Sequence, residues 1–202
     1  MERMIPEERQ ERAIKRMLEE PPNAALNGSL MGTGKTLMAV EVAKRRGDKV
    51  ILIIAPLGTR LGWQRTFAQQ GVELPFQWIN STKAGLAAQA NWQWQLPGIY
   101  FVGTELFVRL GWEDDLNKCL GEKFDKDGNQ VLKDGKPVLV YAEKRSMMWA
   151  ETPDIVLFDE AHRSQNRQSK TFKTLKQVNA GYKMSMSGTP AGNKIEGAWA
   201  VT

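Results

Sequence analysis

The sequence predicts an α/β fold in three layers, with a mostly parallel sheet in the middle and a phosphate-binding loop near the start of the chain. Three observations carry this prediction. A glycine-rich loop at 29–36 ends in Gly-Lys-Thr, an Asp-Glu pair directly follows the apolar run 154–158, and short apolar strands alternate with helices along the chain. Repeated strand–helix units favour parallel sheets with right-handed crossovers, and 202 residues suit one such domain.

The composition limits the cellular locations and the chemical mechanisms that we expect for the chain. The net charge is +5 and the pI is about 9.3, a mild basic excess that is compatible with nucleic acid without establishing it. The single cysteine, Cys119, excludes an internal disulfide and fits a reducing compartment. One histidine excludes any mechanism that needs two. A charged N-terminus and the lack of a long apolar run predict no membrane partner and a cytoplasmic location, or a nuclear one in a eukaryote.

The loop at 29–36 matches the phosphate-binding consensus G-x-x-x-x-G-K-[ST], except that Ser29 replaces the first glycine. Gly32 and Gly34 allow consecutive N–H groups to converge on phosphate oxygens, and the following helix adds its positive end. We expect Lys35 to reach the β- and γ-phosphates and Thr36 to bind Mg²⁺. An ordinary glycine-rich turn is the alternative, which the flanking strand and helix make less favourable. The nucleotide-binding residues predicted here are Met31, Gly32, Thr33, Gly34, Lys35 and Thr36.

The elements around the loop follow from proline position and apolar periodicity. A helix is expected from Pro6 to about Glu19, because proline at the first helical position and acidic residues in the first turn favour a helix start. A short buried strand at 24–26 leads into the loop, and a helix follows from near Lys35. The continuous apolar run at 49–55 is typical of a parallel strand that is buried on both faces.

The middle of the chain continues the alternation. We expect a helix from Thr59, a weaker strand at 76–79, a small helix at 83–90, a strand at 99–102 and a helix from Thr104. Trp92 and Trp94 lie in a polar, aromatic stretch without clear period. They have the rings to stack on bases, but we favour their interpretation as partly buried anchors.

The region 113–145 departs from this rhythm. The pairs Asp127-Gly128 and Asp134-Gly135 are signatures of hairpin turns, so we predict a small antiparallel β-meander inserted at about 113–149. Two roles for this insertion remain open: it contacts DNA or a protein partner, or it is a surface feature without a binding role. The alternation then resumes with a strand at 154–158, a helix at 169–178, a strand at 183–186 and a helix from Lys194.

No acidic residue lies between Glu160 and Glu196, although seven basic residues do. These are Arg163, Arg167, Lys170, Lys173, Lys176, Lys183 and Lys194. Solvated helix and loop faces explain such a run about as well as a patch that faces phosphates. The sequence leaves both interpretations open.

Asp159 and Glu160 stand at the carboxyl end of an apolar strand, where a Walker B pair is expected. The first carboxylate would hold Mg²⁺, and the second would orient and deprotonate the attacking water. An Asp-Glu pair after a strand is common by itself. Together with the phosphate loop, it predicts hydrolysis of a nucleoside triphosphate.

The letters at 159–162 read DEAH and those at 187–189 read Ser-Gly-Thr, so the chain resembles superfamily 2 helicases and translocases. Within that superfamily it most resembles the Swi/Snf-type DNA translocases. The stretches that carry this resemblance are 31–36, 55–57 with 63–67, 104–106, 159–166, and 187–193 with Trp199. Thr66 departs from the pattern, because the family usually has an acidic residue there.

The resemblance implies a RecA-like fold, ATP with Mg²⁺ as cofactors, and DNA, in double-stranded form, as a sequence-independent partner. It implies catalytic roles for Lys35, Asp159, Glu160 and His162, with Thr36 and Asp159 at the metal. Gln10 would recognise adenine, although its flanking residues match only loosely. His162 would couple the nucleotide to Ser187, Gly188 and Thr189. The DNA strand would meet Pro56, Leu57, Gly58, Thr59, Thr104 and Arg163 through phosphate contacts rather than base contacts.

The family also uses two RecA-like lobes, with ATP between them and an arginine finger from the second lobe. The 202 residues end after the Ser-Gly-Thr motif, so we expect a single first lobe over 1–202, completed by a second lobe on another polypeptide and weak in hydrolysis alone. Such a short chain would suit a phage or a mobile element.

The predicted function is the ATP-binding lobe of a DNA-dependent ATPase, a helicase or a double-stranded DNA translocase. The alternative is a non-catalytic, nucleotide-dependent DNA-binding or adaptor module, which would have no physical need for Lys35, Thr36, Asp159 and Glu160 together. A phosphate-loop kinase or a small GTPase is disfavoured, because the DEAH and Ser-Gly-Thr motifs have no role there.

Overall fold

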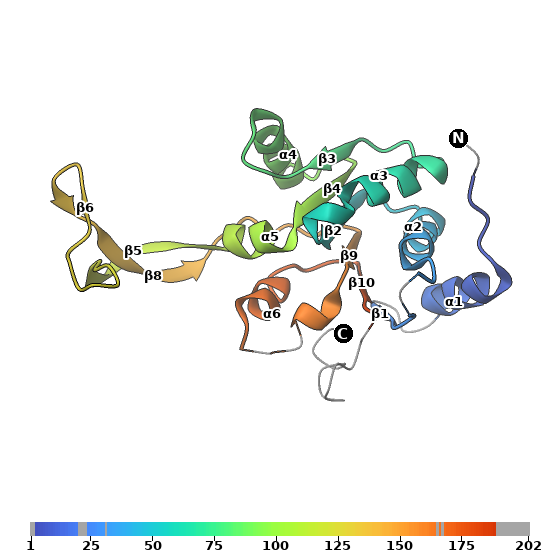
Figure 1. The fold of residues 1–202 in the computed structure, drawn as a ribbon. Helices are drawn as coiled ribbons and strands as arrows, with labels where there is room; N and C mark the ends of the chain where they lie inside the picture. The colour runs from blue at the N-terminus through green and yellow to red at the C-terminus, as the bar shows by residue number, and fades with distance from the viewer. Residues whose placement is uncertain (1–2, 20–23, 31, 165, 167, 189–202) are drawn as a thin grey trace.

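The computed structural model describes residues 3–19, 24–30, 32–164, 166 and 168–188. Six strands form one parallel sheet in the order β1-β10-β9-β2-β4-β3 (Figure 1). The predicted α/β class with a mostly parallel sheet is therefore confirmed. The strands are β1 Ala24–Asn27, β2 Val50–Ala55, β3 Phe76–Trp78, β4 Gly98–Gly103, β9 Ile155–Phe158 and β10 Tyr182–Met186.

The helices connect these strands and cover both faces of the sheet. They are α1 Glu8–Glu19, α2 Lys35–Arg46, α3 Arg60–Gln69, α4 Lys83–Gln93, α5 Thr104–Leu110 and α6 Lys170–Leu175, with short 3-10 helices η1 Leu57–Thr59 and η2 Ala161–Ser164. Each predicted helix is present within a few residues of its expected bounds, except the one from Lys194, which lies outside the described residues. Among the helices of the described ranges, none has the length and apolar character needed to cross a bilayer.

The core lies in two layers because β2 is apolar on both faces. Ile51 and Ile53 pack with α1, α2 and α3, whereas Leu52 and Ile54 pack with α4, α5 and the region of α6. Alternate residues of a strand point to opposite faces, so a continuous apolar run can serve two layers of helices. Helices, sheet and helices give the predicted three layers (Figure 1).

The insertion is a long antiparallel hairpin that extends away from the sheet (Figure 1). Strand β5 Trp112–Glu122 pairs with β8 Leu139–Arg145, and β6 Leu132–Lys133 pairs with β7 Lys136–Pro137 near the tip. The turn between β6 and β7 has φ of 53° at Asp134 and 73° at Gly135, and positive φ at both central residues is what a type I′ hairpin requires.

The excursion is shorter than the expected range of 113–149. It ends with β8 at Arg145, and the next residues return to the core. Trp149 has 0% of its surface exposed and donates from Nε1 to the carbonyl of Phe107 at 2.9 Å. Trp149 falls within the range expected for the insertion, so its burial in the core was not predicted.

Candidate nucleotide and DNA site

The strand order brings three distant segments to one edge of the sheet. Strands β1, β10 and β9 are neighbours, so the phosphate loop, Ser187 and Asp159 follow their carboxyl ends side by side. Neighbouring strands lie about 4.8 Å apart, which puts the phosphate loop and the DEAH segment roughly 10 Å from each other. Ser187 N donates to the carbonyl of Asn27 at 3.1 Å, which joins two of these segments directly. Open α/β sheets bind ligands at this edge.

The phosphate loop has the backbone that its glycines permit. Gly32 and Gly34 both have φ of 77°, and Gly34 is the N-cap of α2. A Cβ at position 34 would lie 2.5 Å from Gln10 Nε2, so a side chain there would displace the end of the Gln10 side chain in addition to straining the backbone. Met31 lies outside the described residues, and its predicted contact with the nucleotide is untested.

Ser29 fits the loop without the conformational freedom of glycine. Its φ is not positive, and its N–H donates to Asn27 Oδ1 at 3.2 Å. Lys35 Nζ donates to the carbonyls of Ser29 and Leu30, each at 3.1 Å, while Thr33 Oγ1 donates to Leu30 O at 2.7 Å. The lysine is therefore held against the loop by backbone carbonyls.

Gln10 lies against the phosphate loop. Its Nε2 donates to the carbonyl of Thr33 at 3.0 Å, and its Oε1 accepts from Glu7 N at 2.8 Å. Each amide atom keeps a further hydrogen or lone pair for a ligand. The residue that the loose sequence match assigned to adenine is thus at the nucleotide loop.

Asp159 is a half-buried carboxyl next to two charged groups. Burial raises its pKa, and Glu160 also acts to raise it by charge; the N–H of Glu160, Lys35 and the indole of Trp63 act in the opposite direction. The N–H of Glu160 donates to Asp159 Oδ1 at 3.0 Å. The charge of Lys35 acts on this carboxyl, so Lys35 and Asp159 lie near each other at this edge of the sheet.

Glu160 has an unusual backbone and a specific partner. Its φ is 53°, a left-handed conformation that costs a non-glycine residue of order 1–3 kcal/mol and is concentrated at functional sites. Its Oε2 lies 3.1 Å from His162 Nδ1, and the same nitrogen lies 3.3 Å from Ser187 Oγ. The single histidine of the chain therefore lies between Glu160 and Ser187 of the Ser-Gly-Thr motif. Gly188 follows Ser187, and Thr189 is outside the described residues.

Trp63 is a site residue that sequence reasoning used only as a motif landmark. It lies in α3 and is 1% exposed. Its indole is near enough to Asp159 to lower the carboxyl pKa, yet within the described part of the chain its Nε1 meets no acceptor at hydrogen-bond geometry. Buried N–H groups usually have hydrogen-bond partners. The missing partner of the Trp63 indole among the described residues is visible only in the structure.

The predicted DNA-contacting residues follow β2 and β4 at the same edge. Leu57 is 53% exposed, Gly58 is exposed, and Thr59 Oγ1 donates to the carbonyl of Pro56 at 2.8 Å. Beside them is an open cavity of about 330 Å³ lined by Leu57, Trp78, Asn80, Ser81, Gly103, Glu105, Leu106 and Arg109. The segments after β2 and β4 thus border one hollow.

Thr104 does not offer its hydroxyl to this hollow. The residue is 5% exposed, and its Oγ1 is enclosed without a partner among the described residues. The hydroxyl is therefore shielded in the observed conformation, although the next residue, Glu105, is exposed and lines the hollow. Arg163 lies in η2, where only its backbone is described.

The basic residues in the described ranges have different environments, and Lys173 of α6 is exposed. Lys170 pairs with Glu143 of the inserted hairpin, Lys176 Nζ lies 5.2 Å from the ring centre of Phe172, and Lys183 is partly buried in β10, where burial lowers its pKa. These contacts favour the interpretation as solvated and structural lysines. Arg167 and Lys194 are outside the description.

The two tryptophans of the 91–95 stretch have different environments. Trp92 is 0% exposed and donates to the carbonyl of Met148 at 2.8 Å, so its interpretation as an anchor is confirmed. Trp94 is 79% exposed, so the same interpretation is wrong for it. Trp94 follows α4 and precedes β4, which puts it at the amino edge of the sheet, away from the candidate site.

A phosphate loop after β1 and an Asp-Glu pair after β9, in a parallel sheet between two layers of helices, define a P-loop NTPase domain of the RecA-like type. The sequence comparison then gives the family. A family model described as the SNF2-related domain matches residues 9–201, and the chain belongs to this family.

The curated relatives are much longer than this chain. The SNF2 domain-containing protein CLASSY 3 of Arabidopsis thaliana is 25% identical over 184 residues, which cover 81% of this chain and 13% of the relative. The chromodomain-helicase-DNA-binding protein 7 of Homo sapiens is 28% identical over 171 residues, which cover 82% of this chain and 5% of the relative.

Solved structures share the fold. The SWI2/SNF2 ATPase core of Sulfolobus solfataricus in complex with dsDNA has a TM-score of 0.65 at 18% identity, covering 98% of this chain and 35% of that one. The UvsW helicase of bacteriophage T4 has a TM-score of 0.61 at 14% identity, covering 98% of this chain and 58% of that one.

Proposed function

We propose that this chain is the ATP-binding lobe of a DNA-dependent ATPase, of the helicase or double-stranded DNA translocase type, which couples ATP hydrolysis to movement on DNA. One observation carries the proposal. Three distant segments meet at one edge of the sheet, and they carry Lys35, the pair Asp159 and Glu160, and Ser187. His162 lies between Glu160 and Ser187.

The residues at this edge fit ATP with Mg²⁺. The loop N–H groups and the start of α2 favour an anion, and Lys35 is already aimed across the loop. In the described ranges no cluster of three or more His, Cys, Asp or Glu side chains would hold a metal. Thr36 and Asp159 would therefore bind Mg²⁺ together with phosphate oxygens and water, as is usual for this ion. Bound Mg²⁺ would neutralise charge on the phosphates.

Each remaining residue has a role that its position supports. Lys35 would exchange the carbonyls of Ser29 and Leu30 for the β- and γ-phosphates. Glu160 would accept the proton of the attacking water. Gln10 would read adenine, because a glutamine amide matches the N6 and N7 edge of that base.

His162 would link hydrolysis to the rest of the motor. A shift of Ser187 would change the hydrogen bonding of His162 and therefore the freedom of the Glu160 carboxylate. The segments after β2 and β4 would follow a DNA strand through phosphate contacts, which are sequence-tolerant and sensitive to salt. The dsDNA in the Sulfolobus ATPase core structure supports this part of the proposal.

A second lobe would complete the site. This chain corresponds to 35% of the Sulfolobus ATPase core, which supports the need for a further lobe that supplies an arginine to the transition state. An arginine supplied by a partner accelerates phosphoryl transfer by about 10³–10⁵ in comparable enzymes. The chain alone should therefore bind ATP and hydrolyse it slowly.

The test is ATP turnover by the purified chain, with and without double-stranded DNA and with and without a polypeptide that carries a second lobe. Glu160→Gln is the control for contaminating activity. Turnover that needs both DNA and the second lobe supports the proposal. Binding of ATP without turnover under all four conditions would instead support the non-catalytic adaptor.

A further inference from the structure

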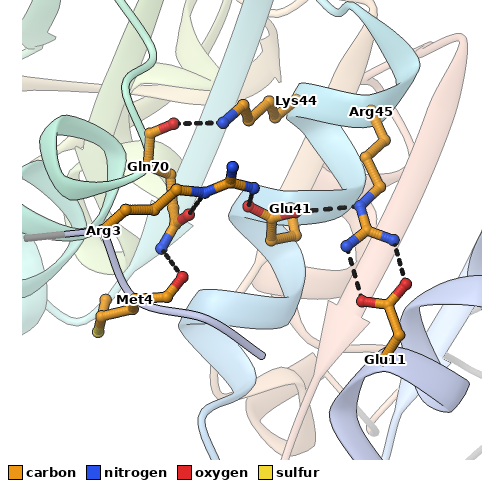
Figure 2. A network of polar contacts seen from close by, with 7 residues as sticks. All are labelled: Arg3, Met4, Glu11, Glu41, Lys44, Arg45 and Gln70. Carbon is orange, nitrogen blue, oxygen red and sulfur yellow. Dashed lines mark hydrogen bonds and ion pairs between the residues drawn. The ribbon is translucent and has the colours of Figure 1, made fainter. Parts of the chain in front are cut away.

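A buried carboxylate lies in the helix that follows the phosphate loop (Figure 2). The side chain of Glu41 in α2 is 1% exposed and accepts hydrogen bonds from Arg45 Nε at 3.0 Å and Arg3 Nη2 at 3.4 Å. Burying a carboxylate is unfavourable unless cations and hydrogen bonds compensate for the lost water. Glu41 therefore fixes the position of the Arg45 guanidinium.

The same guanidinium reaches α1. Arg45 Nη1 and Nη2 lie 2.6 and 2.7 Å from the two carboxylate oxygens of Glu11, which is a bidentate pair (Figure 2). The hydrogen bonds from Arg45 lower the pKa of Glu11. Bidentate arginine–carboxylate pairs fix orientation as well as distance. One side chain thus joins the phosphate-loop helix to the first turn of α1.

Glu11 is the neighbour of Gln10, whose amide lies on the carbonyl of Thr33. The other attachments of α1 lie toward its C-terminal half, where Ile14 is buried in the core and Tyr182 donates from its hydroxyl to the carbonyl of Met17. The pair between Glu11 and Arg45 therefore fixes the end of α1 that carries Gln10.

A second branch holds the segment before α1. Arg3 Nε donates to Gln70 Oε1 at 3.2 Å, and Gln70 Nε2 donates to the carbonyl of Met4 at 2.9 Å (Figure 2). Lys44 of α2 donates to the Gln70 carbonyl, which ties this branch to the same helix. The segment before α1 and the first turn of α1 are thus both attached to α2, the helix that begins at the phosphate loop.

We propose that Glu41, Arg45 and Glu11 are positioning residues that set the base selectivity of the nucleotide site by holding Gln10 in place over the phosphate loop. This inference rests on the proposed function, in which Gln10 reads adenine. A bidentate contact between glutamine and adenine is worth about 5- to 100-fold in discrimination against another base. Loss of the correct Gln10 position should remove a large part of that factor.

Glu11→Ala is the test, and Glu8→Ala is the matched control. Both carboxylates lie in the first turn of α1, so both changes remove the same favourable interaction with the helix dipole. Glu8 is 89% exposed and only approaches Arg12, at 4.0 Å. The affinities to measure are those for ATP, GTP and inorganic tripolyphosphate, all with Mg²⁺, and tripolyphosphate is the probe that has no base.

Glu11→Ala should weaken ATP binding, bring the affinity ratio of ATP to GTP close to one, and leave tripolyphosphate binding unchanged. Glu8→Ala should change none of these values. In a Gln10→Ala background, Glu11→Ala should have no further effect on ATP, because it acts through Gln10. Glu11→Gln, which keeps the size of the side chain, should give an intermediate loss of selectivity.

An unchanged ratio of ATP to GTP in Glu11→Ala would overturn the inference, as would an equal loss for all three ligands or the same change in Glu8→Ala. If Gln10→Ala itself left the ratio unchanged, the adenine role of Gln10 would be wrong and the inference would fail with it. An unsubstituted chain that bound no ATP would overturn the proposed function as a whole.

Discussion

Replacing Gly34 by alanine tests the geometry of the phosphate loop. Position 34 has φ of 77°, and a Cβ there would lie 2.5 Å from Gln10 Nε2. The left-handed backbone costs an alanine about 1–2 kcal/mol, and displacement of Gln10 removes its bond to Thr33 O, worth about 1 kcal/mol. We therefore expect Gly34→Ala to lower the free energy of unfolding by about 2–3 kcal/mol.

Gly32→Ala separates the two contributions. Gly32 has the same φ of 77°, but a Cβ there would meet nothing within 4 Å. Gly32→Ala should therefore lower the free energy of unfolding only by the cost of the left-handed backbone, about 1–2 kcal/mol. Urea denaturation of both variants, together with Gln10→Ala in the Gly34→Ala background, measures the difference. Equal losses in the two glycine variants, or a loss from Gly34→Ala that is as large in the Gln10→Ala background as in the unsubstituted chain, would refute the contact between Gln10 and the loop.

Three further predictions concern the fold and the site. Burial raises the pKa of Asp48 from 3.8 to about 6, so the folded state favours the protonated carboxyl. The free energy of unfolding therefore falls as the pH rises through that range. Asparagine does not titrate there, so between pH 4 and pH 7 the free energy of unfolding of Asp48→Asn should rise by up to about 3 kcal/mol relative to that of the unsubstituted chain in urea titrations. Lys35→Ala should weaken ATP binding at least tenfold by calorimetry, whereas Glu160→Gln should keep binding and lose turnover; normal turnover by Glu160→Gln would contradict its role with the attacking water. Trp149→Phe should lower the free energy of unfolding by about 1–3 kcal/mol, because it removes the indole hydrogen bond to the Phe107 carbonyl and leaves a cavity where the larger ring is buried. Leu120→Ala on the exposed hairpin should change the same free energy by less than about 0.5 kcal/mol.

The sequence was sufficient for features that depend on nearby residues. The alternation of strands and helices, the glycines of the phosphate loop and the turn at Asp134-Gly135 follow from periodicity and from the backbone conformations that single residues allow. The continuous apolar run of β2 also predicted burial on both faces. These signals are local, so the chain carries them before it folds.

The tertiary structure alone decided which distant residues meet. Gln10 reaches Thr33, His162 lies between Glu160 and Ser187, and Arg45 bridges two helices only because of the strand order and the way α1 packs on α2. Burial of the Thr104 hydroxyl likewise depends on packing that the sequence does not display. Such contacts depend on the relative placement of whole elements, which no local pattern of residues encodes.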